Sequence, residues 1–133
     1  MSILKMPDSI GSFVISSKGE ETKQIWQGRF KVKRILSHAD RFEIKRVFRE
    51  IVGKDILDRN SEDFIKAGML AEVRVRVLEA PHWFRESNSG MDLVDLSPIS
   101  DILTKCYEEE ANWRTDLIKA SEPESEEAKK NEK

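Results

Sequence analysis

The side chains that could do chemistry are few and lie far apart in the sequence. His38 and His82 are not placed at a metal-ligand spacing such as H-x-x-x-H. Cys106 is the single cysteine, so it has no second sulfur for a disulfide or a zinc site, and it falls on an apolar stripe where cysteine acts as a small hydrophobic residue. Asp92 and Asp95 suggest paired carboxylates, but they flank a predicted helix start, where acidic residues are expected for capping.

Sequence motifs of catalysis are also missing. The chain contains no Walker-type phosphate loop, no G-x-G-x-x-G after a strand, no G-x-S-x-G elbow and no acidic metal cluster. The sequence therefore predicts no enzyme activity, no cofactor and no metal site.

Charge is one-sided in a single block, from Arg29 to Arg49, which holds eight basic and two acidic residues. Within it, Arg41, Lys45 and Arg49 fall on the polar face of a predicted helix. Such a row is either a solvated helix face or a docking patch for an acidic partner or for phosphates. We take these three residues as candidate partner-binding residues.

Three consecutive rings follow Pro81: His82, Trp83 and Phe84. An aromatic cluster beside a loop is either a lid that closes the core or an exposed anchor for another protein. Pro81, His82, Trp83 and Phe84 are therefore the second set of candidate partner-binding residues.

The elements around these residues begin with a predicted β-hairpin. Residues 1–20 form an arm or edge strand, and the alternation of Phe30 and Val32 with basic residues predicts a half-buried strand. The two strands join near Lys18–Glu20. Gly28, next to Trp26, suits a bulge or leaves room for the indole.

Three helices are predicted after the hairpin. The first is capped by Ser37 with Asp40 in its first turn, and it ends at Gly53. The second begins at Ser61 and extends to about Leu78, although the alternating valines of 73–77 would also fit a strand. Arg74 and Arg76 in this helix are expected to pair with acidic residues.

A proline at position 81 ends the second helix, because the residue before a proline disfavours the helical conformation. Ser97 and Pro98 open the third helix, which extends to about Ile118. The fold class is thus α+β: an N-terminal β-hairpin or short sheet packed on a bundle of about three α-helices. Residues 21–119 form the single domain, and 120–133, with five glutamates and three lysines, form a disordered acidic tail.

No apolar run reaches the length of about 18 to 20 residues that spans a bilayer, and no signal peptide is evident at the N-terminus. The chain is expected to stay in the cytosol where it is made, without a membrane partner.

Five short motifs occur in order along the chain. They read W-x-G-x-F-x-V-K at 26–33, L-S-H-x-D at 36–40, L-A-E-V-x-V-R-V at 70–77, A-P-x-W-F at 80–84 and G-x-D-L-x-D at 90–95. This order resembles small proteins that tailed bacteriophages encode among their tail genes, the tail assembly chaperones. The resemblance covers about residues 22 to 118. It departs at Phe84, where the family leads us to expect a second tryptophan, so an aromatic pair remains, but a contact that needs a tryptophan at this position is not implied.

The resemblance implies a non-catalytic role in the host cell cytoplasm. Tail assembly chaperones bind the long helical tape measure protein, help the tail tube protein to polymerise around it, and are absent from the finished particle. The sequence leaves self-association open.

Two other classes of function stay open. One is a virion structural protein, such as a head or tail completion protein or a minor tail component. The other is a nucleic-acid-binding module centred on 31–49, which ranks last because aromatic interleaving is limited there and Phe48 belongs to the core face of its helix.

Overall fold

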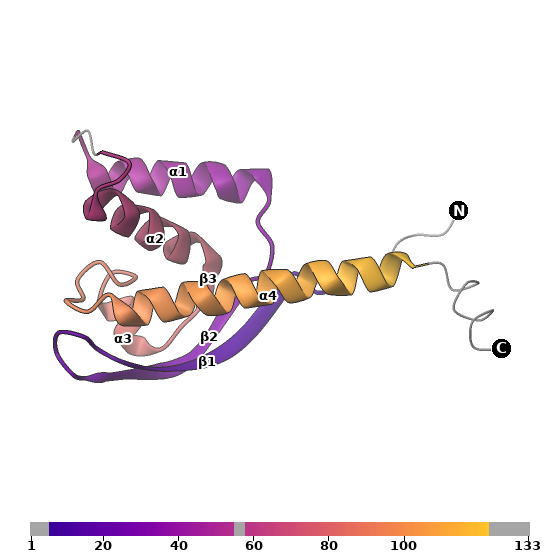
Figure 1. Ribbon diagram of the computed structural model, residues 1–133, viewed down its shortest axis with the longest axis horizontal. Helices are drawn as coiled ribbons and strands as arrows, with labels where there is room; N and C mark the ends of the chain where they lie inside the picture. Colours follow the sequence, from indigo (N-terminus) through magenta and orange to yellow (C-terminus); the bar gives the residue numbers. More distant parts are fainter. Residues whose placement is uncertain (1–5, 55–57, 123–133) are drawn as a thin grey trace.

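The structure, a computed structural model, describes residues 6–54 and 58–122, which form a three-stranded antiparallel sheet and four helices (Figure 1). In chain order the elements are β1 (Ile10–Lys18), β2 (Ile25–Lys33), α1 (His38–Val52), α2 (Glu62–Arg76), β3 (Val77–Glu79), α3 (His82–Glu86) and α4 (Ser97–Ser121). Helix α4 lies across the sheet, α2 packs on α4, and α1 packs on α2. The predicted α+β class, with an N-terminal hairpin and three long helices, is confirmed.

Strands β1 and β2 form the predicted hairpin over nine residues each, with Phe13 opposite Phe30 and Gly11 opposite Val32. Their side chains alternate, so that Phe30 and Val32 are buried while Arg29 and Lys31 face solvent. The strand order is β1-β2-β3, so β1 is one edge strand of the sheet and β3 is the other.

Gly28 makes room for a proline and not for an indole. Its φ is 152°, and a Cβ placed on it would lie 2.2 Å from Cγ of Pro81. The close approach of Pro81 brings the segment that follows it onto β2. That segment is the one-turn helix α3.

The loop between β1 and β2 is fastened to the start of α4 by two carboxylates. Asp95 accepts hydrogen bonds from the backbone N–H groups of Glu21 (2.8 Å) and Thr22 (3.0 Å), from the Thr22 hydroxyl, and from Nε1 of Trp26 (2.8 Å). In the opposite direction, the Glu20 carboxylate in the hairpin loop accepts hydrogen bonds from the backbone N–H groups of Leu96 and Ser97. The prediction that Asp95 serves to cap the helix is therefore wrong, because Glu20 from the hairpin loop does so.

Helix α1 has the predicted local signals at both ends. The Ser37 hydroxyl accepts from the N–H of Asp40, whose carboxylate accepts from the N–H of Ser37, and Gly53 closes the C-terminus with a φ of 67°.

Helix α2 begins at the predicted Ser61 cap but ends at Arg76, two residues before the predicted end. The next three residues form β3, in which Val77 lies opposite Val32 and Glu79 opposite Lys31. The edge of β2 supplies backbone partners there, and Pro81 already favours an extended chain before it. The prediction of a helix to Leu78 is corrected accordingly.

The core lies between the sheet and the helices α2, α3 and α4. Its buried members are Ile15, Phe30, Val32, Leu70, Val73, Phe84, Ile99, Ile102, Leu103 and Cys106. Helix α4 extends to Ser121, so the first residues assigned to the acidic tail are helical, while 123–133 lie outside the described residues. Of the helices in the described part of the chain, none is both long and apolar enough to cross a membrane.

Candidate functional site

An open groove follows the junction of α1 and α2 on one face of this helix pair. Helix α1 is the outermost layer of the molecule and packs mainly on α2, so one side of it has no other element against it (Figure 1). Two hollows lie along the junction and adjoin at Ile44 and Lys45, which line both. Together we call them the α1/α2 groove.

The first hollow is apolar and has a volume of about 540 Å³. Its lining residues are Ile44, Lys45, Phe48, Arg49, Phe64 and Gly68. The rings of Phe48 and Phe64 meet edge to face with their centroids 5.1 Å apart, and both stay partly exposed. On α2, Gly68 adds no side chain of its own to the hollow, next to the ring of Phe64.

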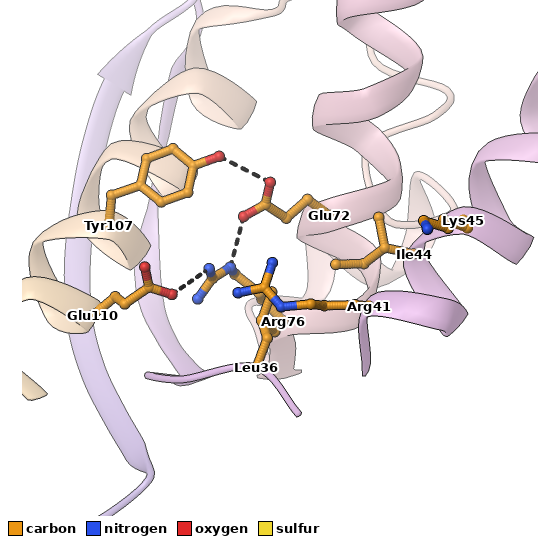
Figure 2. A pocket seen from close by; sticks show the side chains of 8 residues that line it. All are labelled: Leu36, Arg41, Ile44, Lys45, Glu72, Arg76, Tyr107 and Glu110. Atoms are coloured by element: carbon orange, nitrogen blue, oxygen red, sulfur yellow. Dashed lines mark hydrogen bonds and ion pairs between the residues drawn. The ribbon is translucent and has the colours of Figure 1, made fainter. Parts of the chain in front are cut away.

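The second hollow is charged and has a volume of about 530 Å³ (Figure 2). Its lining residues are Leu36, Arg41, Ile44, Lys45, Glu72, Arg76, Tyr107 and Glu110. They come from α1, α2, α4 and the segment before α1. The hollow therefore joins three helices at one end of the groove.

Arg76, at the base of this hollow, is buried and makes three hydrogen bonds. Its guanidinium donates to Glu72 (2.8 Å), Glu110 (2.9 Å) and the carbonyl oxygen of Lys33 (3.2 Å). Burial alone would lower the pKa of Arg76, but its bonds to Glu110 and Glu72 outweigh burial and raise it. Arg76 therefore connects α2 to α4 and β2. The prediction that Arg76 pairs with acidic residues is confirmed.

Tyr107 completes this network at its outer side. Its hydroxyl donates to the second oxygen of Glu72 (2.9 Å), and the guanidinium of Arg76 lies 5.6 Å from its ring centroid. Burial, together with the bond to Glu72, raises the pKa of Tyr107 to about 12. The phenol thus stays protonated at neutral pH and holds Glu72 toward the arginine.

The three basic candidates of α1 line the groove and differ from their neighbour Arg46. Arg41, Lys45 and Arg49 are exposed, and no acidic side chain in the described ranges lies within ion-pair distance of any of them. Arg46, on the same helix, pairs with Glu43 and Glu50. Among the described residues, the positive charge of these three side chains along the groove is thus not balanced by an ion pair.

The aromatic candidates have a different position. Phe84 is 3% exposed and packs against Phe30 with ring centroids 5.5 Å apart. Trp83 packs between Trp26 and Phe30, and its Nε1 donates to the carbonyl oxygen of Gln27 (2.9 Å). His82 points outward, with 83% of its side chain exposed. Trp83 and Phe84 therefore close the core, as the lid alternative describes.

The two sets of candidates are not brought together. Helix α3, which carries His82, Trp83 and Phe84, lies on the far side of α2 from α1 (Figure 1). Pro81 contacts the hairpin at Gly28 instead of the groove. A single partner-binding surface made of all seven residues is thus absent from the described part of the chain.

Gly68 and the hollow around it were missed by the sequence reasoning. The available signal was a glycine inside a helical pattern, where it is unfavourable by about 0.5–1 kcal/mol relative to alanine. Phe48 was assigned to the core face of its helix, and nothing in the spacing indicates that it stays partly exposed.

The groove offers apolar surface and basic side chains to a binding partner. Among residues 6–54 and 58–122, no cluster of three or more His, Cys, Asp or Glu side chains is placed to hold a metal. Burial raises the pKa of the Cys106 thiol to about 12, so it stays protonated at neutral pH. What the groove can do is accept apolar side chains and pair with carboxylates or phosphates.

Comparison of the chain with protein-family models, with curated protein sequences and with solved structures found no match.

Proposed function

We propose that the chain is a non-catalytic tail assembly chaperone of a tailed bacteriophage, acting in the host cell cytoplasm on the tape measure protein. The observation that carries the proposal is the α1/α2 groove, in which an apolar hollow adjoins a charged one and exposed basic side chains line both. The motif order described above supports the choice of family. The groove supports the choice of a binding role over a catalytic one.

The groove suits a client that would aggregate alone. A long helical protein exposes apolar stripes until its partners assemble around it, and each exposed stripe promotes aggregation. A chaperone that covers such a stripe needs a surface that is apolar in the middle and charged at the edge, because the complex must stay soluble. Phe48 and Phe64 provide the first property and Arg41, Lys45 and Arg49 the second.

Co-expression tests the proposal. The full chain is produced together with the protein encoded beside it, the candidate being one that is very long and helical. We expect the long protein to move from the pellet to the soluble fraction and to co-purify with the chain. Equal solubility with and without the chain, and no complex, would reject the chaperone function. Recovery of the chain in purified particles would instead indicate a virion component.

A further inference from the structure

Neither the backbone geometry nor the packing of the described residues explains the glycine at position 68. It lies within α2, and it is absent from the positive-φ glycines, which are Gly28, Gly53 and Gly90. A Cβ placed on Gly68 would meet no atom of the described residues within 4 Å, whereas a Cβ on Gly28 or Gly90 would collide with Pro81 or Ile99. Neither backbone conformation nor internal packing therefore requires glycine at this position.

A glycine in the interior of a helix destabilises the helix relative to alanine. The space that Gly68 leaves open is therefore more important than any contribution of the residue to stability. Gly68 lines the apolar hollow together with Phe48 and Phe64. Any larger side chain would project into the hollow. The glycine thus keeps an apolar depression open to solvent, and this allows another chain to approach the backbone of α2 closely.

The basic residues along the groove have a regular spacing. Arg41, Lys45 and Arg49 are four residues apart on α1, so they lie on one face and cover about 12 Å of its length. A second helix lying along α1 can present carboxylates at three- or four-residue spacing to all three. An irregular segment has no such repeat.

We propose that the α1/α2 groove binds an acidic amphipathic helix of the partner protein, with a large apolar side chain over Gly68 and carboxylates facing Arg41, Lys45 and Arg49. This inference rests on the proposed function only for the identity of the partner, a segment of the tape measure protein. The residues that hold the helix follow from the groove itself.

A helix fits this groove better than an extended strand. The backbone N–H and C=O groups of α1 and α2 are used within these helices, so no strand edge is present for β-pairing at the groove. Two packed helices instead offer a groove for the ridge of a third, with axes about 8–10 Å apart where small residues allow it. Gly68 is the small residue at that position.

A peptide is also favoured over nucleic acid. Phosphates would use the basic row but would leave the depression between Phe48 and Phe64 unoccupied. An amphipathic helix uses both features at once. A substitution at Gly68 should therefore weaken the binding of a helix but not the binding of nucleic acid.

The test uses the full chain and a fluorescein-labelled synthetic helix of about 18 residues, with leucine on one face and glutamate on both flanks. Its control is the same peptide with lysine in place of each glutamate. Binding is measured by fluorescence anisotropy at two salt concentrations. We expect the glutamate peptide to bind at least about tenfold more tightly than the lysine peptide, with a preference that decreases as salt rises.

Two pairs of variants locate the binding site. Gly68→Leu fills the depression and is expected to weaken binding at least about tenfold, while Lys66→Leu, an exposed position two residues away on α2 that does not line the groove, has a much smaller effect, from the loss of one positive charge. Arg49→Glu is expected to weaken binding, while Arg46→Glu makes the same change of net charge outside the groove and has a smaller effect. Circular dichroism and thermal melting establish that each variant is folded.

The outcomes separate the site from the function. Unchanged binding by Gly68→Leu, equal affinity for the two peptides, or absence of peptide binding overturns the groove proposal. A DNA duplex that displaces the labelled peptide, and whose affinity is the same for the Gly68→Leu variant, also overturns the groove proposal. That result would indicate a phosphate-binding surface. If Gly68→Leu still solubilises the long helical protein, the chaperone function stands without this groove. If the peptide binds as expected but the long protein is not solubilised, the groove stands and the chaperone function fails.

Discussion

Asp95 uses both of its carboxylate oxygens to hold the hairpin loop against the start of α4. Oδ1 accepts the N–H groups of Glu21 and Thr22, and Oδ2 accepts the Thr22 hydroxyl and the Trp26 indole N–H. All four donors point at one side chain. A neutral amide in its place offers a single acceptor oxygen and turns an NH₂ group toward donors.

We therefore expect Asp95→Asn to lower the melting temperature by about 5–10 °C. Asp92→Asn, at an exposed position three residues earlier, is the control and should melt like the unaltered chain. Thermal denaturation followed by circular dichroism measures both. Equal melting of Asp95→Asn and Asp92→Asn would show that the hydrogen bonds to Asp95 add nothing to stability.

Phe84 gives a second prediction about a single residue. Because it is buried against Phe30, Phe84→Ala leaves a cavity in the core and is expected to reduce the free energy of unfolding by about 3–5 kcal/mol. His82→Ala, at the exposed position in the same helix, should change it by less than about 0.5 kcal/mol. Urea unfolding measures both variants. If Phe84→Ala is as stable as the unaltered chain and loses only partner binding, Phe84 is an anchor for another protein and not part of the lid.

The residues that the sequence predicts well are those with local partners. Ser37, Asp40 and Gly53 act within four residues of their own positions, so their roles follow from spacing alone. Asp95 has donors more than sixty residues away, and no local pattern indicates them. Its apparent role at a helix start was also plausible, which is why the sequence led to the wrong assignment.

The sequence of α2 and β3 favours two different secondary structures. Its alternating valines favour a strand while the surrounding periodicity favours a helix, and the chain takes both states in turn, helix to Arg76 and strand from Val77. The position of the change depends on the edge of β2, which sequence periodicity does not encode. The helix itself could be predicted, but the third strand could not.

Gly68 makes α2 less stable than it could be. Since Gly68 has ordinary helical geometry and open space around its Cβ position, Gly68→Ala is expected to raise the free energy of unfolding by about 0.5–1 kcal/mol. Urea unfolding measures the change. The comparison variant is Gly28→Ala, which should be destabilised because its methyl group would collide with Pro81. A loss of stability in Gly68→Ala would reveal a packing role for this glycine within the chain.

At the scale of the whole molecule, acidic side chains fasten separate elements to one another. Glu20 joins the hairpin loop to α4, Asp40 joins the start of α1 to Lys33 of β2, and Asp95 joins α4 to the hairpin. The pKa of Glu20 is lowered, chiefly by the N–H of Ser97. Burial alone would raise the pKa of Asp40 and of Asp95, but bonds from Lys33 and from Thr22 outweigh burial and lower both.

These shifts fix the direction of the pH dependence. A carboxyl group whose pKa is lower in the folded state stabilises the fold fully above its unfolded pKa of about 4, and this stabilisation is lost as the pH falls toward the folded value. We therefore expect the urea midpoint to fall progressively below about pH 4. The decline should be shallower in Asp95→Asn, because asparagine does not titrate. A midpoint that stays constant or rises between neutral pH and about pH 2.5 would show that these carboxylates do not hold the elements together.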